Sequence, residues 1–207
     1  MILDIHTHKP APQPEGVISL RIRAGEESQP ALAEGQLYSA GIHPWDSAEG
    51  DAFETVEALC SLPQVAAVGE SGVDILRGGP MFMQLNLFRR HIELSERIGK
   101  PIVVHCVKAD DIICGLRRDL RPAMPWAIHG YRGKPSAASQ LVKSGCYISF
   151  GEHFNADTLR SVPEERILAE TDESELSIEA IISRLSEAAG RDLRPAIAAN
   201  TLRFLGL

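Results

Sequence analysis

The sequence predicts an α/β protein of the (β/α)8 TIM-type barrel class, and three observations lead to that prediction. Eight short runs rich in β-branched residues are separated by turn residues. From the fourth run onward, each run is followed by a pattern typical of a helix. Because strand and helix alternate, the strands should be parallel and joined by right-handed crossovers, and eight of them can close a barrel.

The expected strands extend along the whole chain, over residues 2–5, 17–22, 37–41, 65–69, 102–105, 126–129, 147–150 and 167–170. The clearest helix is expected between Pro80 and Gly99, after the fourth strand. Leu85, Phe88 and Ile92 are spaced there at +3 and +4, which predicts one apolar face toward the sheet.

The expected barrel is trimmed, because its 207 residues fall below the roughly 250 that are typical of this fold. We expect the reduction in the first two crossovers. Residues 9–16 are few and rich in proline, which excludes a helix, and residues 23–36 leave room for a short one at most. An open sheet of six strands is the alternative. Since no linker or internal repeat divides the chain, we expect residues 1–207 to form a single domain.

Composition and charge exclude several functional classes. A hydrophobic share of 44% is typical of a globular protein. The formal net charge of −7 argues against a broad footprint on duplex DNA or on an anionic membrane, although bound divalent cations can still hold an anion locally. No apolar run approaches the ~20 residues of a membrane helix, so we expect no membrane partner. Four cysteines without a CxxC pair favour a reducing compartment, so we expect a cytoplasmic protein. No protein partner can be inferred.

Side chains that bind metal ions stand at or just beyond the ends of five expected strands. They are His6, His8, Glu70, His105, His129 and Asp172. The carboxyl ends of barrel strands meet at one mouth, so these groups should converge. A single histidine is more often a packed core residue than a ligand, but a set placed at the same strand ends favours a metal site. Imidazole and carboxylate ligands favour Zn²⁺, Mg²⁺, Mn²⁺ or Co²⁺.

Seven segments resemble, in order, the TatD family of metal-dependent hydrolases. Residues 4–8 are similar to its opening D-x-H-x-H, residues 41–45 to its G-I-H-P segment and residues 68–74 to its G-E-x-G-L-D strand. The remaining matches are Gln84 with Phe88, His105, His129 before Gly130, and Glu170-Thr171-Asp172. The resemblance implies the same barrel with a site for two divalent metal ions, in the short form of the family.

The resemblance also implies a role for each matching residue. His6, His8 and Asp172 would hold one ion, His105 and His129 the other, and Glu70 would bridge them. Two such ions acidify a water to hydroxide and stabilise charge on the attacked centre. Glu70 and Asp172 are thus the expected catalytic residues, with Asp172 accepting the proton of the nucleophile.

The resemblance leaves the substrate open. We expect a nuclease or phosphodiesterase of the deoxyribonuclease type, which acts on single-stranded nucleic acid or on a small phosphodiester. One alternative is an amidohydrolase-like deacylase that acts on an ester or an amide. Another is a catalytically inactive metal-binding protein, although all six ligand positions are retained.

Three residues are candidates for substrate contacts: His43, Lys108 and Arg132. His43 would either donate a hydrogen bond to the substrate or cap the barrel beside Trp45. Lys108 follows Val107, which stands where relatives commonly carry Arg. Arg132 follows His129 where relatives carry neutral residues, and its guanidinium fork matches phosphate oxygens. The alternative for Arg132 is a solvent-exposed charge at the start of a helix.

Other conspicuous residues are expected to be structural. His91 should be solvated or at the edge of the core, and His153 should lie in a surface loop, with the mouth as the alternative. Arg117, Arg118 and Arg121 have helical spacing and should form an exposed face rather than a nucleic-acid patch.

Overall fold

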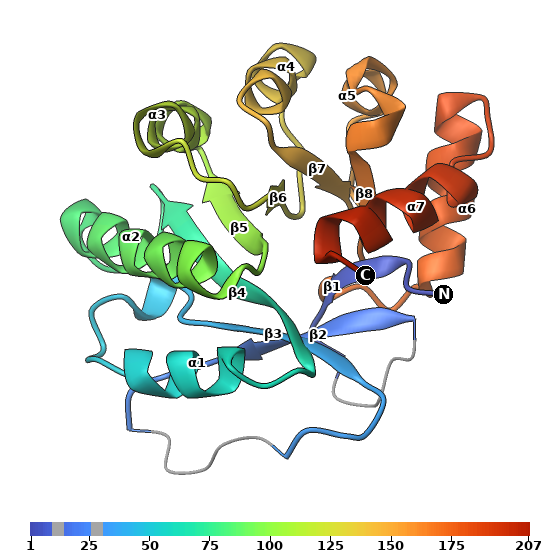
Figure 1. Cartoon of the computed structure of the whole chain (residues 1–207). Helices are drawn as coiled ribbons and strands as arrows, with labels where there is room; N and C mark the ends of the chain where they lie inside the picture. The colour runs from blue at the N-terminus through green and yellow to red at the C-terminus, as the bar shows by residue number, and fades with distance from the viewer. Residues whose placement is uncertain (10–14, 26–30) are drawn as a thin grey trace.

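Eight parallel strands close into a barrel in the computed structural model, which describes residues 1–9, 15–25 and 31–207. The strands follow one another around the barrel in chain order, and β1 closes on β8 (Figure 1). They are β1 (Asp4–Thr7), β2 (Gly16–Arg21), β3 (Leu37–Gly41), β4 (Val65–Asp74), β5 (Ile102–Val107), β6 (Trp126–Ile128), β7 (Tyr147–Phe150) and β8 (Ile167–Ala169). The predicted barrel is confirmed, and the open sheet of six strands is wrong.

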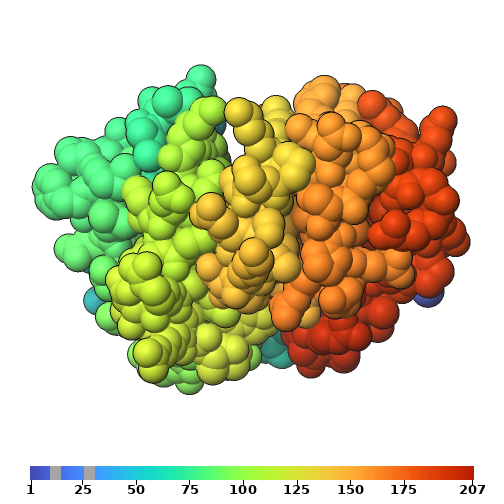
Figure 2. Space-filling view, turned by 90° about the horizontal axis from the view of Figure 1, so that it is seen from above, coloured from blue at the N-terminus to red at the C-terminus, as the bar shows by residue number. Residues whose placement is uncertain are grey.

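Helices surround the barrel on the outside (Figure 1). They are η1 (Pro44–Asp46), α1 (Phe53–Cys60), α2 (Met81–Ile98), α3 (Asp110–Leu120), α4 (Pro135–Lys143), α5 (Ala156–Ser161), η2 (Glu164–Arg166), α6 (Ile178–Ala189) and α7 (Arg194–Leu205). Seen from above, α2 to α6 lie side by side in chain order (Figure 2). Within residues 1–9, 15–25 and 31–207, no helix has the length and apolar character needed to cross a membrane.

The first two crossovers fall partly outside the described residues. The expectations for the connections 9–16 and 23–36 involve residues 10–14 and 26–30, which the structure does not describe. The expectation of a single domain stays a prediction.

Strand β4 is longer than the sequence suggested. It continues past Gly69 to Asp74, so that Glu70 lies within the strand instead of after it. The expected strand ends at Gly69, whereas in the structure Gly69 and Gly72 allow β4 to lie close against β5. Both have positive φ values, 122° and 151°, and a Cβ on Gly72 would lie 2.1 Å from the carbonyl oxygen of His105.

Among the described residues, the core consists of two hydrophobic clusters. The larger cluster fills the space between the strands and the surrounding helices. The smaller cluster contains residues near the starts of the strands, such as Val17, Val103 and Leu168, together with Phe204 and Leu205 from the end of α7. The end of α7 therefore packs at the amino-terminal end of the barrel, which leaves the carboxyl ends of the strands free to form a site.

Two side chains expected near the surface are buried or half-buried. His91 is fully buried. Its ring tolerates this position because both nitrogens have partners: Nε2 accepts the N–H of Ile42 at 3.1 Å, and Nδ1 lies 2.9 Å from the carbonyl oxygen of Leu87. Arg117 is half-buried, and its guanidinium lies over the ring of Trp126, 5.0 Å from the centroid. Both predictions were wrong, whereas Arg118 and Arg121 are exposed as expected.

Candidate metal centre

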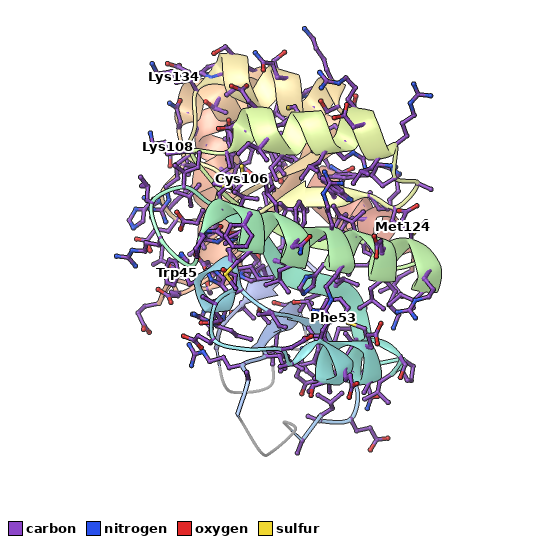
Figure 3. All side chains as sticks on the ribbon, turned by 90° about the vertical axis from the view of Figure 1, so that its left-hand side faces the viewer. Trp45, Phe53, Cys106, Lys108, Met124 and Lys134 are labelled. Atoms are coloured by element: carbon purple, nitrogen blue, oxygen red, sulfur yellow. The ribbon has the colours of Figure 1, made fainter. Side chains whose placement is uncertain are left out.

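The six side chains expected to bind metal ions lie together at the carboxyl ends of the strands. They belong to a strand or follow one closely: His6 and His8 at β1, Glu70 in β4, His105 in β5, His129 after β6 and Asp172 after β8. Figure 3 locates this end of the barrel by Trp45, Lys108 and Lys134, which come after β3, β5 and β6. Met124, which precedes β6, lies at the opposite end.

Backbone hydrogen bonds hold Asp172 beside the two histidines of β1. The Asp172 N–H donates to the carbonyl oxygen of His6 at 2.9 Å, and the His8 N–H donates to the carbonyl oxygen of Asp172 at 3.0 Å. The Asp172 Oδ1 lies 3.7 Å from the Nε2 atoms of both His6 and His8. Three ligand atoms are thereby fixed on one side of the mouth by the closure of the barrel.

The carboxylate of Glu70 stands between two sets of histidines. Its Oε2 lies 3.3 Å from His6 Nε2 and 3.4 Å from His8 Nε2. Its Oε1 faces the other way and lies 2.6 Å from His105 Nδ1 and 2.7 Å from His129 Nε2. The two oxygens therefore belong to two different groups of ligand atoms, which is the arrangement that a bridging carboxylate requires.

The residues present fit divalent metal ions. Both ring nitrogens of His6 are buried and lack a hydrogen-bond partner among the described residues. Unpaired polar atoms in a buried position are costly, and an ion shared with Glu70 and Asp172 would satisfy His6 Nε2. Nitrogen and oxygen donors without thiolate suit Zn²⁺, Mn²⁺, Co²⁺ or Mg²⁺.

Two further carboxylates contact the ring nitrogens of His105 and His129 that lie away from Glu70. The Nε2 of His105 lies 3.2 Å from the Oδ2 of Asp74, and the Nδ1 of His129 lies 3.3 Å from the Oε1 of Glu170. A carboxylate at one ring nitrogen holds the proton there and turns the lone pair of the other nitrogen toward the centre of the mouth. The nitrogens near Glu70 are therefore the ones available to an ion.

His43 also reaches this centre, but its geometry differs from that of a ligand. The Trp45 N–H donates to His43 Nδ1 at 3.1 Å, which occupies the lone pair of that nitrogen. The proton of the neutral ring then lies on Nε2, 3.1 Å from the Oε1 of Glu70. Burial lowers the pKa of His43 despite the neighbouring Glu70, which favours this neutral form. His43 therefore presents an N–H donor to the centre.

The electrostatics of the cluster favour a bound cation. Burial disfavours the charged form of Glu70, but His129, His105 and His43 outweigh burial and hold its pKa well below the usual range. Burial also lowers the pKa of His129, but Glu70 and Glu170 outweigh that effect and raise it well above the usual value. The carboxylates therefore draw positive charge into the buried cluster, as protons or as metal ions.

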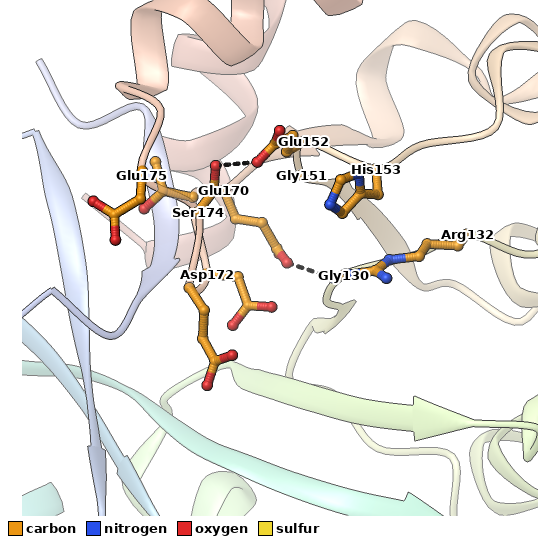
Figure 4. A pocket seen from close by; sticks show the side chains of 11 residues that line it. Gly130, Arg132, Gly151, Glu152, His153, Glu170, Asp172, Ser174 and Glu175 are labelled. Atoms are coloured by element: carbon orange, nitrogen blue, oxygen red, sulfur yellow. Dashed lines mark hydrogen bonds between the residues drawn. The ribbon is translucent and has the colours of Figure 1, made fainter.

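A pocket of about 580 Å³ opens beside these residues, and we call it the mouth pocket. Glu170 and Asp172 line one side of it, while Arg132 and His153 reach in from another (Figure 4). The exposed His153 thus lies in a loop and also lines the mouth. Lys108 is exposed just after β5 and does not line this pocket.

Three residues of the centre received no role from the sequence: Asp74, Glu170 and Trp45. All three stand in segments that resemble the family, but the spacing alone gave no reason to pair them with a ligand. The Trp45 Nε1–H donates to the Oδ2 of Asp74 at 2.6 Å, the same oxygen that faces His105. The shared contact depends on the loop after β3, which spacing does not predict.

The fold and the site define a class: a parallel eight-stranded barrel protein with a candidate centre for two metal ions at its mouth. The TatD related DNase family model matches residues 24–205, and the chain belongs to that family. The matched range begins after β1, so the structure rather than this match places His6 and His8 in the centre.

Curated relatives are about 30% identical to this chain over the residues that align. An uncharacterized metal-dependent hydrolase of Buchnera aphidicola is 31% identical over 158 residues, which cover 68% of this chain and 60% of the relative. A 3'-5' ssDNA/RNA exonuclease TatD of Edwardsiella piscicida is 32% identical over 166 residues, which cover 70% of this chain and 63% of the relative. The matches span less than two thirds of the length of these relatives.

A solved structure shares the fold over its whole length. The TatD homolog YJJV of Escherichia coli K12 superimposes with a TM-score of 0.79 at 19% sequence identity, and the match covers 100% of this chain and 98% of that chain. This likeness supports the barrel fold.

Proposed function

We propose that the protein is a divalent-metal-dependent hydrolase that cleaves phosphodiester bonds in single-stranded nucleic acid. The observation that carries this proposal is the placement of Glu70, whose two oxygens face two separate sets of histidines. Relatives named as 3'-5' ssDNA/RNA exonucleases support the choice of substrate.

The proposed ligand sets follow the geometry of the mouth. His6, His8 and Asp172 would hold one ion with the Oε2 of Glu70. His105 and His129 would hold the other ion with the Oε1 of Glu70. Two divalent ions in these positions would supply an acidified water and would stabilise the charge that develops on phosphorus.

The other side chains of the mouth would bind and orient the substrate. His43 presents an N–H to the centre and would donate a hydrogen bond to a phosphoryl oxygen, which is the first of its two expected roles. Arg132 is exposed at the rim of the mouth pocket and would capture the anion through its guanidinium fork. The side chain of Asp172, 29% exposed, would accept a proton from the nucleophile.

Shortening of labelled single-stranded oligonucleotides tests the proposed function. The wild-type protein should shorten them in the presence of Mg²⁺, Mn²⁺ or Zn²⁺, and Glu70→Gln should lower the rate at least ~100-fold because it removes the bridging charge. Glu187→Gln, at an exposed position of α6, is the matched control and should leave the rate unchanged.

The outcomes separate the proposal from its rivals. Cleavage of acyl esters without any shortening of DNA or RNA would identify a deacylase and overturn the proposal. Metal binding without hydrolysis of either substrate would identify an inactive metal-binding protein.

A further inference from the structure

A second hollow continues from the mouth pocket, and we call it the outer pocket. It also has a volume of about 580 Å³ and shares Arg132, Glu152 and His153 with the mouth pocket. It continues over the loop after β7 to Arg184 on α6. Because three residues line both hollows, a chain-like substrate can extend from the metal centre into the outer pocket.

The charge of the lining reverses between the two pockets. The mouth pocket carries the carboxylates of Glu170, Asp172, Glu173 and Glu175, which suit metal ions. None of these four lines the outer pocket, where Arg132 and Arg184 face the single carboxylate of Glu152. This change of charge suits a polyanion that extends from the mouth pocket into the outer pocket.

The two arginines are available to a ligand. Arg132 forms no hydrogen bond or ion pair with any part of the chain that the structure describes. Arg184 is half exposed, and its NH1 forms a long ion pair with Glu152 Oε1 at 3.7 Å. Exposed ion pairs of this kind contribute little, so a phosphate can compete with Glu152 for Arg184. The other oxygen of Glu152 already accepts the hydroxyl of Ser174, which turns part of its charge away from Arg184.

An aromatic ring lies in the same hollow. Phe154 lines the outer pocket and is partly buried against the hydrophobic core, so that its position is fixed by packing. Aromatic rings in such positions stack nucleic-acid bases without regard to sequence, and arginines beside them bind the backbone. Asn155 lines the same pocket and adds a polar contact.

We propose that the outer pocket is a subsite for the nucleotide next to the scissile phosphodiester, with its phosphate at Arg132 and Arg184 and its base at Phe154. This inference rests on the proposed function, since it assigns the scissile phosphate to the metal centre.

The test compares a fluorescently labelled single-stranded tetranucleotide with the small ester thymidine 5'-p-nitrophenyl phosphate. We expect Arg184→Ala to lower the ratio of kcat/KM for the tetranucleotide to that for the ester about tenfold, which is typical of a lost charge-assisted contact. Arg132→Ala should weaken the use of both substrates, because Arg132 lines both pockets. Arg118→Ala, exposed on α3, is the matched control and should leave the ratio unchanged.

A binding measurement gives a readout that does not depend on catalysis. Fluorescence anisotropy of the tetranucleotide at several salt concentrations should show weaker binding to Arg184→Ala, with a salt slope reduced by about 0.7 for the lost phosphate contact. Phe154→Leu should weaken binding while leaving the salt slope unchanged, because stacking carries no charge.

The outcomes distinguish this inference from the proposed function. If the ester is cleaved but Arg184→Ala changes neither the kcat/KM ratio nor the salt slope, the subsite is wrong and the proposed function stands. If neither substrate is cleaved, the proposed function fails, and the anisotropy measurement alone decides whether the outer pocket binds nucleic acid.

Discussion

Asp74 provides the sharpest test of how the protein chain controls its metal centre. Its Oδ2 faces His105 Nε2 at 3.2 Å and accepts the Trp45 Nε1–H at 2.6 Å. Its Oδ1 accepts the backbone N–H groups of Leu76 and Arg77. In Asp74→Asn, the amide oxygen can keep the two backbone contacts, but the amide nitrogen then faces both His105 and Trp45 and can accept a proton from neither. The substitution therefore releases His105 while preserving the turn.

The loss of the Asp74 carboxylate determines how much the metal affinity should change. Burial raises the pKa of Asp74, but hydrogen bonds from Trp45, Leu76 and His105 outweigh burial and lower it, so that the group is a carboxylate at neutral pH. Loss of such a carboxylate behind a metal-binding histidine typically costs 10- to 100-fold in metal affinity. That range corresponds to about 1.4 to 2.8 kcal/mol of binding free energy at one ion.

Isothermal titration calorimetry of the apoprotein with Mn²⁺ measures this effect. We expect two binding steps in the wild-type protein, and in Asp74→Asn we expect one of the two steps to be 10- to 100-fold weaker. Asp51→Asn is the matched control, because Asp51 also accepts a backbone N–H, from Phe53, and is exposed and pairs with Arg90. Unchanged affinities at both steps in Asp74→Asn would refute the role of Asp74 in positioning His105.

Two further predictions concern Arg132 at the rim of the mouth pocket and His91 in the core. Arg132→Ala should lower kcat/KM by an amount equivalent to ~1 to 3 kcal/mol and leave the metal content unchanged, since Arg132 would contact the anion only. Unchanged kinetics would place Arg132 in solvent. Burial lowers the pKa of His91 from 6.5 to about 4. As the pH falls, His91 is therefore protonated in the unfolded chain before it is protonated in the folded protein. The free energy of unfolding should fall by about 3 kcal/mol between pH 6.5 and pH 4. His91→Gln should flatten that decline in urea unfolding measured at each pH, and equal slopes for both proteins would contradict the assignment.

Local pattern predicted most of the barrel and the set of side chains that gather at its mouth. Period-two spacing placed His6 and His8 on one side of β1, and parallel topology implied that the strand ends would meet. The spacing of the two histidines depends only on residues close together in sequence, and the meeting of the strand ends depends only on the parallel arrangement of the strands. They are therefore visible without the structure.

Contacts between distant segments could not be predicted in this way. The pairing of Trp45 with Asp74 depends on the path of the loop after β3, and the extension of β4 depends on how closely Gly72 approaches His105. The burial of His91 had a visible signal, since it follows Phe88 by three positions on the apolar face of α2. The neighbouring Arg90, in contrast, favoured a solvated position for His91.

The number of metal ions bound per chain shows whether the mouth of the barrel holds a pair of ions. Protein saturated with Mn²⁺ and freed of excess ion should contain two ions per chain by elemental analysis, and their electron paramagnetic resonance spectrum should show magnetic coupling between the pair. Coupling is expected because the two oxygens of Glu70 face both ligand sets. One uncoupled ion per chain, or fewer, under saturating metal would contradict the account.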